Sequence, residues 1–476
     1  MRKALIAFCL LFALAVGGII FIHADVNEVR DQVVITEEVL YGDKSAAEGL
    51  TILAEAELND GVLNWNTTYT IGEEPKTHTD FEYVDHRRTR PVDYEPSGLM
   101  LSDARNYHSS DWTRSGDGSG LSGLDLAYWE LMQDTPVGEE GERIIRVIDY
   151  YDYYPLQPEL ELPNYFMNYW FGEINQSVSL EQQENMEQVF QNLTDYWKIP
   201  VLPSETMSIN LSRRDESGVG GWGSGTGNGV RYDMMAHTTV TDNACYFVMN
   251  NRATDDRIMD FSHVPGGYGI HMISYEYNPT EAGTMVDPDS LHMAYPLDEE
   301  SRVLWLDHTE ENDRLLLATL EGNGDTVLRV IECGSMKTLQ ELTIYEAEQY
   351  ETFLVADCMD DIVLFRSNNG WTTLLEERGD GTYDVVIDIP VNEEQQASYG
   401  FHTVHWNGEK LVMACPLSQA DWQSGDNCGF NVAVYDKNGA LFVGKYTSSL
   451  DTKTYSYYSG DNCFLWNSNP LHISWK

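Results

Sequence analysis

Short runs of apolar residues, separated by turn-forming residues, recur along most of the chain. In the C-terminal part they lie at 315–320, 326–332, 338–345, 352–356, 362–365, 371–376, 383–389, 403–406, 410–414, 431–435 and 441–446. Asn-Gly or Asp-Gly pairs follow several of these runs, and such pairs supply the positive φ angles of tight turns. Near the N-terminus, residues 50–58 and 62–71 flank Asn59-Asp60-Gly61 and are predicted to form a hairpin. The pattern predicts a chain that is mostly β.

The predicted strands follow one another about every ten residues, in groups of four that recur about every 40–50 residues, a period typical of β-propeller blades. From this spacing the chain resembles the β-propeller architecture. It lacks a repeated Trp-Asp dipeptide, an Asp-box series and a kelch double glycine, so the resemblance transfers no catalytic residues. We expect an all-β propeller of about 6–7 blades over residues 46–476. Tandem β-sandwiches are the alternative, which the regular spacing without a clear linker disfavours.

The chain ends close to its last predicted strand, at 463–466 or 472–475. In a propeller such a strand pairs with an early strand and closes the ring, because one blade alone leaves free edges. The expected partner is 31–40 or 50–58. Residues 25–45 are therefore predicted to be either a short stalk or a closing strand.

One segment has helical rather than strand periodicity. Residues 180–197 place Met186, Val189, Phe190, Leu193 and Trp197 on one face. Ser179, followed by Gln182, fits a capping box at the start of this helix. The pattern predicts a helical insertion at 178–198 that covers an apolar end of the barrel or, alternatively, docks a partner protein.

The first two dozen residues have the pattern of an export signal. Arg2 and Lys3 precede nineteen residues, 4–22, whose only polar side chain is Cys9. This run is close to the ~20 apolar residues that span a bilayer, and the two bases favour a cytoplasmic N-terminus. We therefore predict a signal-anchor helix at 1–24 and a single-pass cell-membrane protein with its C-terminal domain extracytoplasmic. Cleavage after Ile22-His23-Ala24, followed by secretion, is the alternative.

The chain carries a large excess of acidic residues. It has 77 Asp and Glu against 29 Lys and Arg, and two of those bases precede Asp25. The exported part therefore has 77 acidic and 27 basic residues, an excess of 50 negative charges. This excess excludes nucleic acid, whose phosphates bind Lys and Arg. It also excludes docking on anionic lipid, so we expect contact with the membrane only through the N-terminal helix.

The densest group of aromatic residues lies at 150–171. Its members with candidate ligand-binding roles are Tyr150, Tyr151, Tyr153, Tyr154, Tyr169 and Trp170. Tyrosine and tryptophan combine an apolar face with a polar tip, which suits glycans and peptides. The alternative is an edge strand at 149–154 in which alternate tyrosines are packed and exposed.

A glycine-rich stretch at 217–229 carries a further candidate, Trp222. Gly218, Gly220 and Gly223 match GxGxxG formally, but the segment after them is strand-like, whereas a dinucleotide loop opens a helix. We therefore predict a loop, either plain or holding Trp222 over a pocket mouth. Residues 115–123 are predicted to form a similar loop.

Other residues with metal or catalytic chemistry show no motif. The six cysteines after Cys9 form no CxxC pair and are predicted to be mainly buried, with Cys415 and Cys428 the nearest pair for a disulfide. The histidines lack an HExxH motif and are predicted to be structural. The acidic turns lack the full oxygen-ligand set of a calcium loop. We expect neither a metal nor a cofactor, with calcium as the alternative, and the catalytic residues stay unknown.

These observations favour a non-enzymatic role. We expect a membrane-tethered, extracytoplasmic sensory or surface module that binds a ligand or protein, with a glycan, a peptide or a surface protein as partner. The first alternative is a carbohydrate-active hydrolase or lyase on a propeller scaffold. The second is a scaffold for a membrane protein assembly that docks through the 180–197 helix.

Overall fold

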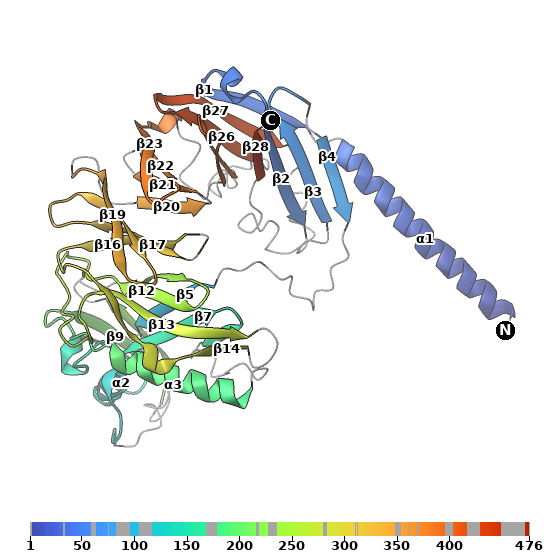
Figure 1. Cartoon of the computed structure of the whole chain (residues 1–476). Helices are drawn as coiled ribbons and strands as arrows, with labels where there is room; N and C mark the ends of the chain where they lie inside the picture. The colour runs from blue at the N-terminus through green and yellow to red at the C-terminus, as the bar shows by residue number, and fades with distance from the viewer. Residues whose placement is uncertain are drawn as a thin grey trace. The chain divides into compact units, whose positions relative to one another are not determined.

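The computed structural model of the chain describes most of its residues and is mostly β, with one apolar helix at the N-terminus (Figure 1). The described ranges are 2–31, 34–58, 63–74, 76–81, 96–103, 117–167, 179–215, 219–226, 236–278, 283–309, 311, 313–347, 354–359, 361–367, 370–395, 403–416, 429–448 and 472–475. The chain forms two compact units. Unit 1 comprises residues 1–93, 362–376 and 384–476, and unit 2 comprises 94–361 and 377–383.

The N-terminal helix α1 spans Arg2–Asp31. Its segment Leu5–Ala24 has a mean hydropathy of 2.9, and none of it is buried against the rest of the chain. At 1.5 Å rise per residue these 20 residues extend about 30 Å, the thickness of a bilayer core. The predicted apolar helix is therefore confirmed, while its role as anchor or cleaved signal stays a prediction.

Unit 1 contains two sheets that join the two ends of the chain. One has the order β1–β27–β26–β25–β24 and the other the order β28–β2–β3–β4. The strands are β1 (Ile35–Gly42), β2 (Leu50–Leu58), β3 (Leu63–Thr70), β4 (Lys76–Phe81), β24 (Thr403–Trp406), β25 (Leu411–Pro416), β26 (Gly429–Asp436), β27 (Gly439–Ser448) and β28 (His472–Trp475). The predicted β2–β3 hairpin and the pairing of β28 with β2 are both confirmed. Within residues 25–45, β1 pairs with β27, while its role as a closing strand of a ring stays a prediction.

Unit 1 also holds most of the hairpin of β21 (Ile362–Ser367) and β22 (Trp371–Glu377), followed by most of β23 (Tyr383–Pro390); Glu377 and Tyr383 belong to unit 2. Strands β21 and β25 are buried along their described length, because their apolar runs are packed on both faces. The core around the terminal sheets includes Leu50, Ile52, Val432 and Phe442. Burial of both faces explains why these strands appear in the sequence as continuous apolar runs.

Unit 2 contains four sheets. Their orders are β10–β9–β6, β5–β7–β8, β11–β12–β13–β14 with β15 paired to β13, and β16–β17–β18–β19. The strands are β5 (Gly98–Asp103), β6 (Glu140–Arg146), β7 (Leu156–Leu162), β8 (Tyr165–Met167), β9 (Thr206–Arg213), β10 (Val219–Thr226), β11 (Ala236–Val240), β12 (Ala244–Met249), β13 (Gly269–Asn278), β14 (Gly283–Val286), β15 (His292–Pro296), β16 (Arg302–His308), β17 (Arg314–Leu320), β18 (Thr326–Glu332), β19 (Lys337–Tyr345) and β20 (Leu354–Met359).

The β16–β19 sheet follows the chain order, as the strands of a propeller blade do. Its turn at Asn323-Gly324 has a φ of +91° at Gly324, and the Asp325 amide donates to Asn323 (3.0 Å). The tight turn predicted there is therefore confirmed. A propeller of about 6–7 blades, against tandem β-sandwiches, stays a prediction.

Two helices pack on the strands of unit 2 (Figure 1): α2 (Gly123–Asp134) and α3 (Leu180–Tyr196). Helix α3 confirms the predicted insertion, and the Gln182 amide donates to the Ser179 hydroxyl at its start (3.2 Å). Its apolar face, which includes Met186, Val189 and Leu193, is buried in the core of unit 2. The sequence analysis missed α2, although Leu124, Tyr128 and Leu131 lie at helical spacing on its buried side.

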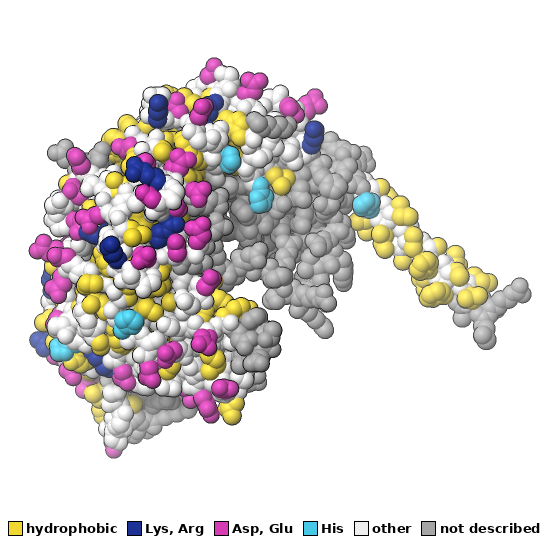
Figure 2. All heavy atoms as spheres, in the orientation of Figure 1, with side chains coloured by type: hydrophobic (Ala, Val, Ile, Leu, Met, Phe, Trp, Pro, Cys, Tyr) yellow, Lys and Arg dark blue, Asp and Glu magenta, His cyan; other side chains and the backbone are white. Residues whose placement is uncertain are grey.

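Acidic side chains are scattered over the described, coloured surface outside the N-terminal helix in Figure 2. This distribution agrees with the formal net charge of −48. Because like charges repel, such a surface favours a soluble, solvent-exposed fold over self-association. The charge alone does not mark a site, so the depressions of the surface and the side chains that line them decide which residues are candidates.

Candidate functional site

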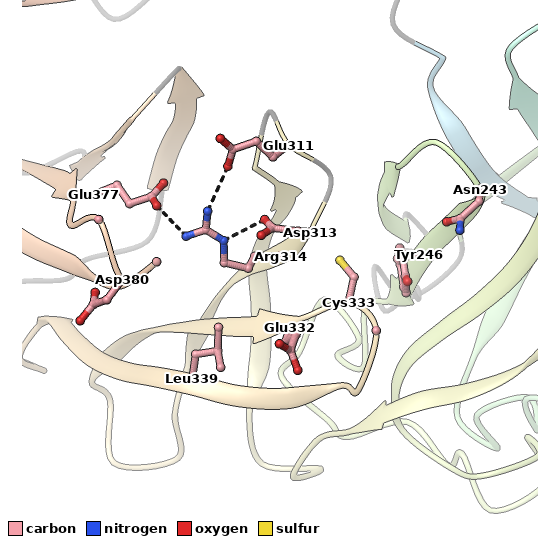
Figure 3. Close-up of a pocket in the computed structure, with 13 residues that line it drawn as sticks. Asn243, Tyr246, Glu311, Asp313, Arg314, Glu332, Cys333, Leu339, Glu377 and Asp380 are labelled. Carbon is pink, nitrogen blue, oxygen red and sulfur yellow. Dashed lines mark hydrogen bonds and ion pairs between the residues drawn. The ribbon is translucent and has the colours of Figure 1, made fainter.

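One open depression in the described part of unit 2 surrounds Arg314, the first residue of β17. Its volume is about 950 Å³, and it is lined by the carboxylates of Glu311, Asp313, Glu332, Glu377 and Asp380. The Arg314 guanidinium donates from Nε to Asp313 (2.9 Å), from Nη1 to Glu377 (2.8 Å) and from Nη2 to Glu311 (3.2 Å) (Figure 3). The Arg314 side chain is only 7% exposed. Three carboxylates therefore neutralise one buried cation from three directions.

The hydrogen bonds around Arg314 change the protonation of its partners. The guanidinium holds the pKa of Asp313 below its usual range. Burial on its own lowers the pKa of Arg314, but hydrogen bonds to Asp313 and Glu377 outweigh it and raise that pKa. Gly381 has a φ of +81°, and a Cβ there would lie 2.7 Å from Nη1 of Arg314. The turn is thus shaped around the guanidinium.

The two remaining carboxylates of this depression are also engaged within the chain. Glu332 accepts a hydrogen bond from the Ser335 hydroxyl, and Asp380 accepts one from the Thr382 amide (3.1 Å). All five carboxylates therefore have contacts inside the chain. This pattern is typical of an ion-pair centre that holds turns together, and not of a site with groups available to a ligand.

The second depression lies on the β10–β9–β6 sheet and has a volume of about 770 Å³. On one face of this sheet Ile145, Met207, Ile209 and Leu211 are buried in the same core as helix α2. Because residues directly opposite in a ladder share a face, the other face carries three cross-strand rows. They are Glu140–Ser212–Gly221, Glu142–Asn210–Gly223 and Ile144–Ser208–Gly225.

We call this outer face the β10 shelf: the side chains of Glu140, Glu142, Asn210, Ser212 and Arg214, the backbone of Gly220 and Gly221, and Trp222 at the edge. Within the described part of the chain, none of the five polar side chains makes a hydrogen bond or an ion pair. Glu140, Glu142, Asn210 and Arg214 are exposed, and Ser212 is half-buried. The shelf therefore differs from the Arg314 centre, because its donors and acceptors are available to a ligand.

The structure separates the predicted tyrosine group of residues 150–154. Tyr150 and Tyr151 contact helix α2, whereas Tyr153 lies beside Pro200 and His263. The Tyr150 hydroxyl donates to Glu130 (2.9 Å), and burial raises the pKa of Tyr150 to about 12. The Tyr151 hydroxyl accepts from the Leu124 amide (2.9 Å). Tyr154 is 2% exposed and donates to Glu205, so it belongs to the core and not to a binding surface. Tyr153 is 36% exposed and packs edge-on against His263, with ring centroids 5.6 Å apart.

The alternative interpretation of this segment, an edge strand, is wrong. Residues 147–149 form a 3-10 turn, and Tyr153 makes only an isolated bridge to Pro200. Tyr169 and Trp170 lie outside the described residues. Tyr150 and Tyr151 are half-buried, so a ligand face stays a prediction for Tyr150, Tyr151, Tyr153, Tyr169 and Trp170.

Trp222 lies in strand β10, which corrects the prediction of a loop over 217–229. The sequence was misleading because Gly220, Gly221, Gly223 and Gly225 dominate the strand, and glycine is uncommon in strands. Trp222 pairs with Leu211 and so leaves the sheet on the α2 side. It is 40% exposed and lines the rim of the shelf.

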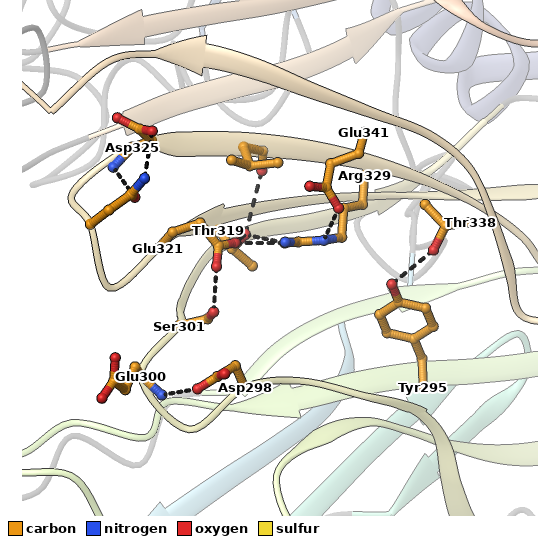
Figure 4. Close-up of polar contacts among 12 residues, drawn as sticks. Tyr295, Asp298, Glu300, Ser301, Thr319, Glu321, Asp325, Arg329, Thr338 and Glu341 are labelled. Atoms are coloured by element: carbon orange, nitrogen blue, oxygen red, sulfur yellow. Dashed lines mark hydrogen bonds and ion pairs between the residues drawn. The ribbon is translucent and has the colours of Figure 1, made fainter.

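A half-buried arginine, Arg329 of β18, is also held in a network of hydrogen bonds (Figure 4). Its guanidinium donates to Thr319 (2.6 Å), Glu321 (2.7 Å) and Glu341 (3.1 Å), and Ser301 donates to Glu321 (2.6 Å). Burial on its own raises the pKa of Glu321, but these hydrogen bonds and the ion pair lower it. The network fixes the β16–β18 strands and has no unsatisfied carboxylate for a ligand.

The described residues contain no group of three or more His, Cys, Asp or Glu that could hold a metal ion. Cys245, Cys333, Cys358 and Cys415 are thiols, and Cys428 lies outside the described range. The acidic turns use their carboxylates internally, as when Asp436 accepts from the Asn438 amide (2.8 Å). His271 is buried, with its Nδ1 2.9 Å from the Tyr196 hydroxyl.

The residues of the shelf were missed by the sequence analysis, although a signal for them exists. In β9 the order Met207-Ser208-Ile209-Asn210-Leu211-Ser212 alternates apolar and polar residues without exception. Such alternation predicts a strand with one buried and one solvated face. What the sequence does not show is that β6 and β10 lie on either side of this strand and align Glu140 and Gly221 with Ser212.

Comparisons with known proteins give no family for the chain. No protein-family model matches it, and no curated protein matches it. Among solved structures, it is similar to the periplasmic gluconolactonase PpgL of Pseudomonas aeruginosa, at 10% identity over 84% of this chain and 96% of that one, with a TM-score of 0.30. It is also similar to the β-propeller domain of Cps50 (Swd1) from Myceliophteria thermophila, at 9% identity over 50% and 78%, with a TM-score of 0.23. At these values the likeness carries no argument about arrangement or activity.

Proposed function

We propose that this chain is a membrane-tethered, extracytoplasmic binding module and that the β10 shelf is its ligand site. The observation that carries the proposal is the convergence on one depression of five polar side chains without a partner in the described chain. The polar groups around Arg314 and Arg329 satisfy one another, as buried polar groups generally do. The shelf side chains are largely exposed, so water satisfies them in the free chain, and a ligand can take the place of that water.

The N-terminal helix supports the tether. Its 20-residue apolar segment has the length of a bilayer span, and Arg2 and Lys3 precede it. Positive charge on that side favours retention of the N-terminus in the cytoplasm, which directs both units outward. The excess of acidic residues after the helix suits a domain that faces water and not the anionic lipid surface.

The alternative functions have less support in the structure. A hydrolase needs one carboxyl group that keeps its proton near neutral pH, which requires burial. Glu140 and Glu142 share the outer face of β6, but both are exposed. A scaffold that docks through α3 needs an apolar face free for its partner, whereas Met186, Val189 and Leu193 are buried in unit 2.

The proposal is tested with the full chain in lipid nanodiscs. The thermal midpoint of unfolding is measured against a library of saccharides, amino acids, short peptides and polyamines, because a ligand at 100 times its dissociation constant stabilises by about 2.7 kcal/mol. Two variants are compared: Gly221→Thr, which fills the shelf, and Gly334→Thr, which fills open space beside Arg314. A Cβ at either glycine meets nothing within 4 Å, so both positions have open space for the first atom of a side chain.

We expect at least one ligand to stabilise the wild-type chain and Gly334→Thr equally, and to have no effect on Gly221→Thr. If every stabilising ligand acts on Gly221→Thr as strongly as on the wild type, the shelf is not the site. Intact-cell proteolysis tests the tether, because both units must be cleaved from outside while α1 stays in the membrane fraction.

A further inference from the structure

The shelf combines donors and acceptors in a way that distinguishes between ligand classes. Glu140 and Glu142 only accept hydrogen bonds, Arg214 only donates, and Asn210 and Ser212 do both. An ammonium ligand would use only the acceptors, and a phosphate or carboxylate ligand only the donors. A sugar hydroxyl both donates and accepts, so a ligand with adjacent hydroxyls engages every member of the set. From this inventory we infer that the shelf binds a neutral saccharide, an inference that rests on the proposed function.

The charge of the shelf indicates whether the saccharide is neutral or charged. Two carboxylates and one guanidinium give a net charge of −1 for its polar side chains. The surrounding chain is strongly acidic as well, with a formal net charge of −48. Uronic acids, sialic acids and sulfated sugars would be repelled, because like charges placed together disfavour binding. The ligand is therefore a neutral sugar.

Glycine provides the floor of the site. Gly221 has an ordinary strand φ, and a Cβ there would meet nothing within 4 Å. Neither the backbone nor the packing thus requires glycine, although glycine weakens a strand. The strand register shifts between Val219 and Gly221, which is one reason for glycine there; close approach of a ligand to the backbone is the reason that we infer for Gly221. At Gly220 a Cβ would lie 2.6 Å from Arg214 Nε, so that glycine lets the guanidinium lie flat beside the floor.

The dimensions of the depression agree with this class of ligand. Its volume of about 770 Å³ lies within the roughly 300–1,000 Å³ of small-molecule sites. Trp222 lines its edge, but its side chain leaves the strand on the opposite face of the sheet, with Leu211. A ligand on the outer face therefore meets the polar side chains and the glycine backbone of the shelf.

The experiment uses the full chain in nanodiscs and isothermal titration with three probes of equal length. They are the neutral tetrasaccharide cellotetraose, the acidic tetragalacturonate and the cationic peptide tetralysine; an array of neutral oligosaccharides extends the first class. We expect binding of a neutral saccharide, and no binding of the other two. Asn210→Ala removes a donor and an acceptor and should weaken binding about tenfold. Gly221→Thr should abolish binding, with an unchanged or raised thermal midpoint, and Gly334→Thr should bind as the wild type does.

The outcomes separate the inference from the proposed function. If tetralysine or tetragalacturonate binds, and Gly221→Thr abolishes that binding, the shelf is a ligand site and the saccharide class is wrong. If a saccharide binds equally to the wild type and to Gly221→Thr, both the inference and the proposed site are wrong. Release of new reducing ends from the bound saccharide would overturn the binding module in favour of a hydrolase. An array on which no neutral saccharide binds overturns the inference.

Discussion

Replacing Arg314 by methionine should destabilise unit 2, and the structure sets the size of the effect. The guanidinium is 7% exposed, whereas its partners Glu377, Asp313 and Glu311 are 16%, 59% and 75% exposed. Pairs with the two exposed carboxylates contribute about 0–1 kcal/mol each. The pair with Glu377 matters more, because removing Arg314 leaves a largely buried carboxylate without a partner. A fully buried pair costs about 3–5 kcal/mol to break, so for Glu377 we expect about 2 kcal/mol.

Hydrogen–deuterium exchange of the β17 amides, Leu315 to Leu317, measures this effect locally. If the β17 amides exchange through opening of unit 2, a loss of about 2 kcal/mol in the free energy of that opening makes their exchange about thirtyfold faster. Arg257→Met is the matched control, since Arg257 pairs with Asp255 on the surface and both side chains are more than a third exposed. It should change exchange less than about twofold.

A double variant tests the reasoning. Arg314→Met combined with Glu377→Gln removes the stranded charge, so it should be more stable than Arg314→Met alone by about 1 kcal/mol. Strictly additive effects of the two changes, or unchanged β17 exchange in Arg314→Met, would refute the account of the Arg314 centre as a structural ion pair.

Three further predictions concern stability. Burial lowers the pKa of His271 from 6.5 to about 4. The unfolded chain therefore binds the extra proton between these values, and stability is full above pH 6.5 and falls by about 3 kcal/mol as the pH decreases towards 4. Denaturant titrations at pH 7 and 4.5 measure the free energy of unfolding of the wild type and of His271→Gln. If both proteins lose the same free energy of unfolding between these two pH values, the prediction is contradicted. Gly381→Ala introduces a Cβ 2.7 Å from Arg314 at a φ of +81° and should cost about 1–3 kcal/mol by thermal unfolding, whereas Gly379→Ala, which meets nothing, should be near neutral. Ser179→Ala removes the cap of α3 and should cost about 1 kcal/mol, measured by amide exchange in its first turn; Ser335→Ala is the exposed control.

Much of the secondary structure could be predicted because local rules determine it. Buried strands such as Leu315–Leu317 are continuous apolar runs, and turns such as Asn323-Gly324 have glycine at a positive φ. The capping box at Ser179 fixed the start of α3. The pairing of β28 with β2 followed from a different argument, the need to protect a terminal strand edge.

The candidate site could not be predicted, because its residues meet only through tertiary pairing. Glu140 and Gly221 are neighbours of Ser212 only through strand register, which no local pattern determines. Clusters of one residue type were misleading because neighbours in the sequence can serve the core and not a common surface. Tyr154 is conspicuous in the sequence, yet its hydroxyl satisfies the buried Glu205, as a core tyrosine often does. The glycines of β10 suggested a loop, because glycine is uncommon in strands.

The central claim is that the β10 shelf faces the exterior and binds a ligand there. The most direct measurement is labelling of Ser212→Cys on intact cells with a membrane-impermeant maleimide, with and without the neutral saccharide array, against the wild-type chain as background. We predict labelling from outside that a neutral saccharide prevents, because Ser212 lines the shelf. Labelling only after cell lysis, or labelling from outside at the same rate with every saccharide, would contradict the account.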